Sequence, residues 1–557
     1  MQIAQVIVEI LKKEGITDAF GIPGAGINPV YKYLKETPEI HHYLMRHEEA
    51  AVHAADAYYR ASGKMALAIC TSGPGATNFV TGIYTAWIDS VPLIAITGQG
   101  NSSQLGKGAF QCVDIAAIVK PVCKKSYCVL DASRIAETLR EAFAEARSGR
   151  PGPVLIDLPL DIQMADIEFN IADYTPVVPG KAKPDQQLIK KAVSLLDAAE
   201  NPVIVMGGGT VSAGAEKQLL EFAEFMNIPV ITTYMAKGGL PEAHPLNAGQ
   251  MGIQAGASSS GNQIFLESDV VLGVGCRFTD RHTGALGVYK GDRRFIHIDI
   301  DPNEIGKLIE PEVGIAADAA EAVPALLQEA RSTGSARKGS PRVGAIPLRK
   351  KNAERKWNNA GEVIDPRDVF GYINSVFNDE TYFTTGCGLN QIWSGQYQKI
   401  NRPRKYLPSG GAGTLGFDIP AAIGASVGAG KQKAVCIMGD FGFTFLVEEL
   451  AVAAKYELPI VVIILNNAYL SLIRQNQKYA YKYEYEVAMK ENKDFINYIQ
   501  VAQGLGCQAE RVFTYEEIQP ALERAAAAAK PYVVEIIVED ATDCNMGNDI
   551  AHINMFA

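Results

Sequence analysis

The sequence has no hydrophobic run long enough to cross a membrane. Its longest clean apolar run, LPIVVIIL at 458–465, is far shorter than the roughly 20 residues that a transmembrane helix needs. The chain also lacks a basic start followed by a cleavage site, so we see no signal peptide. We therefore expect a cytoplasmic protein with no membrane-spanning segment.

Cysteine patterns typical of metal sites or disulfide frameworks are missing too. The nine cysteines are scattered, none belongs to a CxxC pair, and several lie inside apolar runs such as LAICTSG and AVCIMGD. Structural zinc sites and disulfide-rich folds need regular cysteine spacing. We expect buried thiols in a reducing cytoplasm.

An excess of basic residues is absent as well. Lys and Arg number 52 against 62 Asp and Glu, a formal net charge of -10. A basic cluster, RKKNAERK, lies in a stretch rich in Ser and Gly, but the acidic balance argues against a nucleic-acid partner. We predict that this stretch is a solvated connector.

At 557 residues the chain is too long for a single hydrophobic core. Two segments interrupt its apolar pattern, at 167–187 and 332–359, and both are rich in Pro, Gly, Ser or basic residues. We therefore predict three domains, at 1–165, 188–330 and 362–557.

Short β-branched runs alternate with helical patterns along the whole chain, for example PLIAIT, PVIVMG, FIHIDID and PIVVIIL. Such alternation indicates an α/β protein with parallel sheets covered by helices on both faces. The order glycine turn, helix, proline, buried strand occurs at 71–98 and again at 439–467. We predict two similar domains flanking a third, with ligands at the carboxyl ends of the strands.

Two polar side chains follow neighbouring strands of the third region. Asp440 comes directly after AVCIMG, and Asn467 follows PIVVIIL. Carboxylate and amide oxygens, with a nearby backbone carbonyl, suit a magnesium ion that also holds a diphosphate. Gly439 and Gly442 would bring backbone N–H groups to that phosphate. In the alternative interpretation, Asp440 only caps a helix and Asn466-Asn467 makes a turn.

The stretch LMRHEEAAVHAADAYYR carries two adjacent glutamates in a mostly small and apolar run. In a helix they point in different directions. Glu49 shares a stripe with His53 and Asp56 and is expected to be solvated, whereas Glu48 shares one with apolar neighbours and is expected to face inward. An inward carboxylate needs a partner or a shifted pKa. The alternative is a misjudged helix phase or an ordinary ion pair with Arg46.

The middle region carries a weaker nucleotide signal. Gly207, Gly208 and Gly209 follow the strand PVIVM, and Asp299 ends the strand FIHID. Glycines near a pyrophosphate and an acid on a ribose hydroxyl are typical of dinucleotide sites, although the motif alone is weak.

Several segments together resemble one enzyme family. The segments FGIPGAG, TSGPGATN, AFQCVDI, GRPGPVLIDLP, RFTDRHTG, HIDIDPNEIGK, SGGAGTLGFDIP and NNAYLSLIRQNQ resemble the thiamine-diphosphate-dependent acetohydroxyacid synthase superfamily, and within it the glyoxylate carboligases. This resemblance implies pyrimidine-binding, central and diphosphate-binding domains. It also implies thiamine diphosphate, Mg²⁺ and a structural FAD as cofactors, and at least a homodimer, with a homotetramer expected.

The resemblance also implies roles for individual residues. Glu48 would hydrogen-bond the pyrimidine ring of the cofactor and activate it, and Leu415 would press beneath the bent cofactor. Phe110 and Gln111 would come from the partner chain, and Arg281 would approach a substrate carboxylate. The implied thiamine diphosphate contacts are Pro23, Gly24, Gly388, Leu389, Asn390, Gly413, Leu415, Gly439, Asp440, Phe441, Gly442, Asn467, Tyr469 and Leu470. The implied magnesium ligands are Asp440, Asn467 and Tyr469, and the implied FAD contacts are Gly207, Gly208, Gly209, Arg281, Asp299 and Asp318.

The departures from the acetohydroxyacid synthase pattern concern the substrate. Asn476 stands where those enzymes usually have a tryptophan, Leu160 where they have a lysine, and Leu389-Asn390 where they have Gln-His. These departures follow the glyoxylate carboligases. Those enzymes, however, have valine where this chain has Glu48.

We therefore expect a carboligase that joins two small 2-oxo acids or aldehydes, with two glyoxylate giving tartronate semialdehyde and CO₂. Acetolactate synthesis from pyruvate is the alternative, and a flavin-dependent pyruvate oxidase is more remote. A catalytically silent nucleotide-binding subunit is a further alternative, against which Glu48, Asp440 and Asn467 argue.

Overall fold

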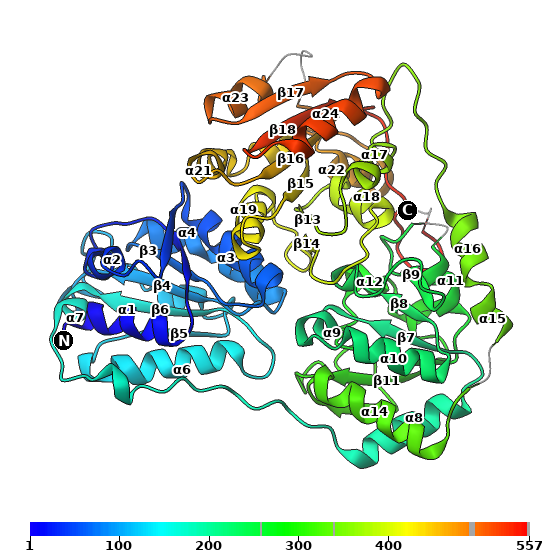
Figure 1. Cartoon of the computed structure of the whole chain (residues 1–557), viewed down its shortest axis with the longest axis horizontal. Coiled ribbons are helices and arrows are strands. Elements are labelled where there is room, and N and C mark those ends of the chain that lie inside the picture. Colours follow the sequence, from blue (N-terminus) through cyan, green and yellow to red (C-terminus); the bar gives the residue numbers. More distant parts are fainter. Residues whose placement is uncertain (257–258, 338–339, 490–495, 554–557) are drawn as a thin grey trace.

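The computed structural model describes residues 1–256, 259–337, 340–489 and 496–553. It contains three sheets of six parallel strands each, with helices on their faces (Figure 1). The predicted α/β class with parallel sheets is confirmed. The first sheet comprises β1 Asp18–Gly21, β2 His41–Leu44, β3 Leu67–Cys70, β4 Ile94–Gln99, β5 Lys125–Cys128 and β6 Val154–Pro159. Its helices are α1 Ile3–Lys13, α2 Asn28–Lys35, α3 Glu48–Ser62, α4 Pro74–Ile88, α5 Ile115–Val119, α6 Ile135–Arg147 and α7 Leu160–Met164.

The central sheet has the doubly wound order of dinucleotide-binding folds, read as β9-β8-β7-β10-β11-β12. Its strands are β7 Pro202–Met206, β8 Val230–Thr232, β9 Asn247–Gln250, β10 Val270–Val274, β11 Arg294–Asp299 and β12 Val313–Ala316. The helices around it are α8 Gln186–Ala198, α9 Gly208–Ala213, α10 Glu216–Met226, α11 Ser260–Leu266, α12 Asp280–Thr283, α13 Leu286–Lys290 and α14 Ala319–Thr333.

The third sheet repeats the strand order of the first. The first runs β2-β1-β3-β4-β6-β5 and the third runs β14-β13-β15-β16-β18-β17, so the predicted likeness of the two regions extends to their topology. The third sheet comprises β13 Tyr382–Thr385, β14 Tyr406–Pro408, β15 Ala434–Gly439, β16 Ile460–Asn466, β17 Gln508–Val512 and β18 Tyr532–Ile537. Its helices are α17 Val369–Val376, α18 Leu389–Tyr397, α19 Asp418–Gly428, α20 Asp440–Phe443, η5 Val447–Glu449, α21 Leu450–Lys455, α22 Ser471–Asn476, α23 Tyr498–Gly504 and α24 Tyr515–Ala527.

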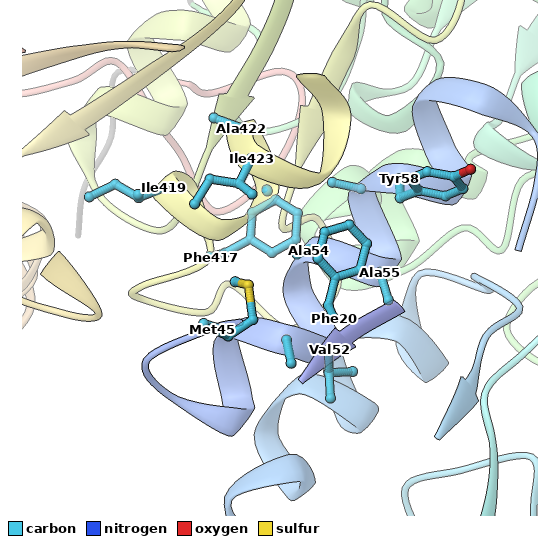
Figure 2. Packing of buried hydrophobic residues seen from close by; sticks show 14 of the residues in the cluster. Phe20, Met45, Val52, Ala54, Ala55, Tyr58, Phe417, Ile419, Ala422 and Ile423 are labelled. Carbon is cyan, nitrogen blue, oxygen red and sulfur yellow. The ribbon is translucent and has the colours of Figure 1, made fainter. Parts of the chain in front are cut away.

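The first and third domains meet where α3 packs on α19 (Figure 2). Both helices are rich in small residues, which lets their backbones approach closely. At Gly424 a Cβ atom would lie 1.9 Å from the carbonyl oxygen of Ala54, so only glycine fits there. Phe417, Ile419 and Ile423 pack against this interface and belong to one core that both domains share.

The predicted solvated connector at 332–359 is partly wrong. It contains two short helices, α15 Pro341–Gly344 and α16 Ile346–Ala353. The guanidinium of Arg342 donates to the Pro202 carbonyl at 3.1 Å, and Ile346 is buried. The few apolar residues of this segment pack on the central domain, a tertiary effect that its composition does not reveal.

All nine cysteines are free thiols, as predicted, but only six of them are buried, and Cys112, Cys128 and Cys387 are partly exposed. Within the described part of the chain, no helix is both long and apolar enough to span a bilayer.

Candidate active site

A cavity of about 120 Å³ lies at the carboxyl ends of β15 and β16. The structure therefore brings Asp440 and Asn467 together at one sheet edge, as their positions after neighbouring strands predict. Among the described residues, all those that line it come from the third domain. Among them are the expected thiamine diphosphate contacts Gly388, Leu389, Asn390, Leu415, Gly439, Asp440, Phe441, Gly442, Asn467, Tyr469 and Leu470.

Asp440 is the charged group of this cavity. It is 2% exposed, and burial raises the pKa of its carboxyl group to about 7, against the opposing effect of nearby backbone N–H groups. Within the described residues, no Lys, Arg or His side chain forms an ion pair with it. A buried carboxylate without a cationic side chain is a good partner for a divalent ion.

Asn467 and Tyr469 lie beside it on the turn after β16. The Asn467 amide oxygen accepts a 3.3 Å hydrogen bond from the Tyr469 backbone N–H and keeps a second lone pair. Among the described residues, no cluster of three or more His, Cys, Asp or Glu side chains could hold a metal. A magnesium site here would therefore need, besides the Asp440 carboxylate, amide and backbone carbonyl oxygens and the phosphates of a ligand.

The side chains on the wall of the cavity are held in different ways. Asn390 is buried, and its amide donates to Thr385 Oγ1 at 3.1 Å and to the Ile437 carbonyl at 3.0 Å. Leu415 lies in the loop before α19 and contributes a bulky apolar surface. Asn476, expected near the substrate, is exposed at the end of α22 and does not line this cavity.

Glu48 is the first residue of α3. The helix therefore begins at Glu48 and not at Leu44, where the stretch LMRHEEAAVHAADAYYR starts. Its carboxylate accepts a 2.9 Å hydrogen bond from the Asn78 amide. A Cβ atom at Gly75 would lie 3.1 Å from its other oxygen. Among the described residues no ion pair joins it to Arg46. Glu48 is half-buried, with its carboxylate against α4.

The expectation of a solvated Glu49 is wrong in part. Its carboxylate lies 3.3 Å from His53 Nε2, with 20% of its side chain exposed. His53 and Asp56, on the same stripe, are completely buried. The reason is that α19 of the third domain covers this face of α3, which the pattern of a single helix cannot show.

The other expected contacts of the first domain line neither the cavity around Asp440 nor the larger cavity between the domains. Phe110 is 89% exposed, and Gln111 has a left-handed backbone, with φ of 55°. At Gly24 a Cβ atom would lie 2.5 Å from Thr71 Cβ, so the loop after β1 that holds Pro23 and Gly24 packs against the loop after β3.

This larger cavity, of about 580 Å³, opens between all three domains. Gly208, Gly209, Arg281, Asp299 and Asp318 line it, as expected, and Gly413 borders it from the third domain. Gly207 does not line it. Its N–H instead donates to the Val274 carbonyl at 2.9 Å, which fixes the turn before α9.

Charged groups from all three domains line this larger cavity. Burial raises the pKa of Asp299 to about 6 and lowers the pKa of Arg150, which lies 3.5 Å from Glu304. Arg281 faces Gln254. With the amide oxygen turned toward the guanidinium, Gln254 accepts from its Nε and Nη2 at 3.3 and 2.9 Å. Its volume lies within the usual range of small-molecule and cofactor pockets.

Comparisons with known proteins agree with this arrangement. Three family models match the chain: the N-terminal thiamine pyrophosphate (TPP) binding domain of thiamine pyrophosphate enzymes at residues 1–118, their central domain at 189–326, and their C-terminal TPP binding domain at 386–536. The chain belongs to the thiamine pyrophosphate enzyme family. Its third-domain cavity lies inside the C-terminal match, and Glu48 lies inside the N-terminal one.

Curated relatives cover nearly the whole length of this thiamine pyrophosphate enzyme. "Glyoxylate carboligase" of Escherichia coli O157:H7 is 41% identical over 100% of this chain and 96% of its own length. "Probable acetolactate synthase large subunit" of Methanocaldococcus jannaschii is 38% identical over 97% and 92%. "Acetolactate synthase large subunit" of Corynebacterium glutamicum is 38% identical over 97% and 87%. The protein is thus a thiamine-diphosphate-dependent carboligase-type enzyme.

Sequence reasoning missed several charged residues of this enzyme's larger cavity. Arg60 and Asp89 line it from the first domain and Arg404 from the third. Arg150 lies within GRPGPVLIDLP, a segment that carries the family resemblance but whose charge gave no separate signal. Their positions result from the packing of three domains, for which the sequence carries no local signal.

Proposed function

We propose that this carboligase joins two molecules of glyoxylate to give tartronate semialdehyde and CO₂. The observation that carries the proposal is the wall of the third-domain cavity. Leu389 and Asn390, two of the positions where the chain departs from the acetohydroxyacid synthase pattern, lie in the same cavity as Asp440. The 41% identity to a glyoxylate carboligase over the entire chain supports the same substrate.

The third domain is suited to hold thiamine diphosphate through Mg²⁺. Asp440 would supply a carboxylate ligand, Asn467 an amide oxygen and Tyr469 a backbone carbonyl. The glycines at the end of β15 leave room for phosphate oxygens close to the backbone. When bound, thiamine diphosphate supplies the carbon nucleophile that adds to the carbonyl of the 2-oxo acid, and it supplies the electron sink for loss of CO₂.

The proton-transfer role falls to Glu48. A carboxyl group that hydrogen-bonds a ring nitrogen of the cofactor exchanges a proton with it, and the present partner of Glu48, the neutral Asn78 amide, leaves the carboxylate charge uncompensated. Leu415 would fix the cofactor's bent shape by contact, and the Gly413 carbonyl would accept from its amine.

We propose that a second copy of the chain completes the site. In the part of the chain that the structure describes, the residues that line the Asp440 cavity all belong to the third domain, whereas Glu48 is hydrogen-bonded within the first. We therefore propose a homodimer whose two sites each combine residues of both chains, and which pairs further into a homotetramer. The exposed Phe110 and its neighbour Gln111 would reach the partner's cavity.

We further propose that the larger cavity holds FAD in a structural role. Its volume, the close-packed turn at 207–209 and the acid Asp299 at the end of β11 suit a dinucleotide. Asp318, at the start of α14, borders the same space. Arg281 would lie at the border between this ligand and the substrate carboxylate.

Acetolactate synthesis from pyruvate is the second candidate. Glu48 favours it, since the glyoxylate carboligases carry valine at this position. The 38% identity to two acetolactate synthase large subunits favours it as well. Rates of CO₂ release from glyoxylate and from pyruvate, at equal concentration and with product identification, separate the two. We expect CO₂ release from glyoxylate to be at least about tenfold faster than from pyruvate, because a difference of one methyl group in the substrate can change a rate by that much. Faster acetolactate formation would replace the glyoxylate proposal.

A further inference from the structure

The segment that leads into α3 is held by two side chains of the third domain. The Leu44 N–H donates to the Tyr456 hydroxyl at 2.8 Å. The N–H groups of Arg46 and His47 both donate to Glu449 Oε1, at 3.0 and 2.8 Å. Donors and acceptors are 402 to 412 positions apart in the chain, so the backbone before α3 takes its position from the η5–α21 segment.

Glu449 is a completely buried acid that the proposed chemistry does not use. Its side chain is 0% exposed, and its Oε2 has no hydrogen-bond partner within the described part of the chain. Burial raises the pKa of Glu449 to about 8, opposed by the two backbone N–H groups. Burying a carboxyl group costs stability, but an apolar side chain here would leave two backbone N–H groups unpaired.

The two residues that Glu449 holds lie immediately before Glu48. His47 caps α3, and its ring accepts a 3.1 Å hydrogen bond from the Glu49 N–H. The backbone at the cap fixes the direction of the first helical turn, so it also determines where the Glu48 carboxylate lies. Misplacing a reacting group by about 1 Å can lower a rate on the order of a hundredfold.

We propose that Glu449 is a positioning residue for Glu48, acting through the backbone of residues 46 and 47. The inference rests on the proton-transfer role proposed for Glu48. In the proposed dimer, Asp440 serves one site, and Glu449, on the segment after it, holds the helix that serves the other. The same short stretch of the third domain thereby shapes both sites.

The first test uses cofactor-free enzyme, so that it does not depend on catalysis. Backbone hydrogen–deuterium exchange of the peptide around residues 44–50 is measured in wild type and in Glu449→Ala. We expect exchange at least about tenfold faster in the variant, because two hydrogen bonds are lost. Glu449→Gln keeps an acceptor oxygen and should stay within about twofold of wild type. Glu523→Ala, which removes an exposed glutamate of α24, is the matched control.

The second test uses loaded enzyme and measures exchange of the cofactor's thiazolium proton. Glu449→Ala should slow this exchange about tenfold and lower kcat with little change in KM. In Glu449→Gln the exchange rate and kcat should both stay near the wild-type values. Tyr456→Phe removes only the more distant hydrogen bond and should have a smaller effect. If Glu449→Ala does not assemble, Glu449→Asp takes its place with the same expectation, since the shorter side chain cannot keep both hydrogen bonds.

The outcomes separate this inference from the proposed function. If Glu48→Gln slows thiazolium exchange and Glu449→Ala does not, the positioning role is wrong and the role of Glu48 stands. If Glu48→Gln has no effect, the proposed function of Glu48 fails, whatever the amide exchange shows. Unchanged amide exchange in Glu449→Ala, or equal effects of alanine and glutamine, would also overturn the inference.

Discussion

The first and third domains have the same strand order but differ in the helices that come after the third strand of each. After β3 the chain enters α4, a helix of 15 residues. After β15 the equivalent stretch is broken into α20, η5 and α21, with Leu446 in a left-handed conformation, φ 54°. The break places Asp440 in a cavity and Glu449 against the first domain, so one topology supports two different tasks.

The two domains also place a carboxyl group at the same point of the fold. Glu48 begins α3 and Asp418 begins α19, helices that occupy equivalent positions and pack on each other. Asp418 accepts a hydrogen bond from the Gly386 N–H, and burial raises its pKa to about 7. Glu48 instead meets the neutral Asn78 amide. Only one of the two acids is left available for a ligand.

The largest effect should come from the third domain. Asp440→Ala removes the only carboxylate among the residues that line its cavity in the described part of the chain. We therefore expect affinity for thiamine diphosphate and Mg²⁺ to fall by at least about a hundredfold. Isothermal titration, with and without Mg²⁺, measures this. Removal of the metal by a chelator should release the cofactor from wild type in the same way. Tight binding by the variant would show that another residue holds the cation.

A change in the first domain should affect proton transfer and not cofactor binding. Glu48→Gln keeps the size of the side chain but cannot exchange a proton, so we expect thiazolium proton exchange to slow by roughly 10²- to 10⁴-fold. Acid-quenched NMR measures the exchange, and titration should give an affinity within about threefold of wild type. An unchanged exchange rate would make Glu48 a structural residue.

Sequence predicts the interior of this fold better than its edges. The central strands, such as β4, β10 and β16, are continuous β-branched runs because helices bury both faces. The strands that escape prediction include several at or near the sheet edges, for instance β2, β5 and β17, whose residues are only partly buried. Half-exposed strands carry polar side chains and so lose the apolar signal.

The residues of the candidate site also fall into those that the sequence predicts and those that it does not. Asp440 and Asn467 are predictable because strand ends and glycine turns are local features. Glu449 gives no local signal, since its partners are backbone groups 402 and 403 positions away. The burial of His53 and Asp56 likewise depends on α19, which no pattern within α3 reveals.

The smallest effect on activity should arise at the contact of α3 and α19, where we expect a change in stability. Asp56 is completely buried there, and burial raises its pKa from 3.8 to about 6, against the nearby Arg60 guanidinium, which lies 3.5 Å away. A raised pKa means that the folded state binds the proton more tightly. The contribution of Asp56 to the free energy of unfolding is therefore present below about pH 4, and it is lost as the pH rises to about 6.

Asp56→Asn should remove this pH dependence. Between pH 4 and 7 the wild type should lose on the order of 3 kcal/mol of unfolding free energy relative to the variant. Urea denaturation across this range measures the difference, and Glu523→Ala, with its exposed side chain, is the control. Parallel curves for wild type and Asp56→Asn would mean that Asp56 stays ionised.

The central claim is that each site combines Glu48 of one chain with Asp440 of another. Mixing Glu48→Gln and Asp440→Ala chains and purifying the mixed dimer through two different tags tests it directly. A shared site predicts one intact and one doubly altered site, so carboligation should recover to about half of the wild-type rate per dimer. Activity no higher than that of the two parent homodimers would contradict the claim and place each site within a single chain.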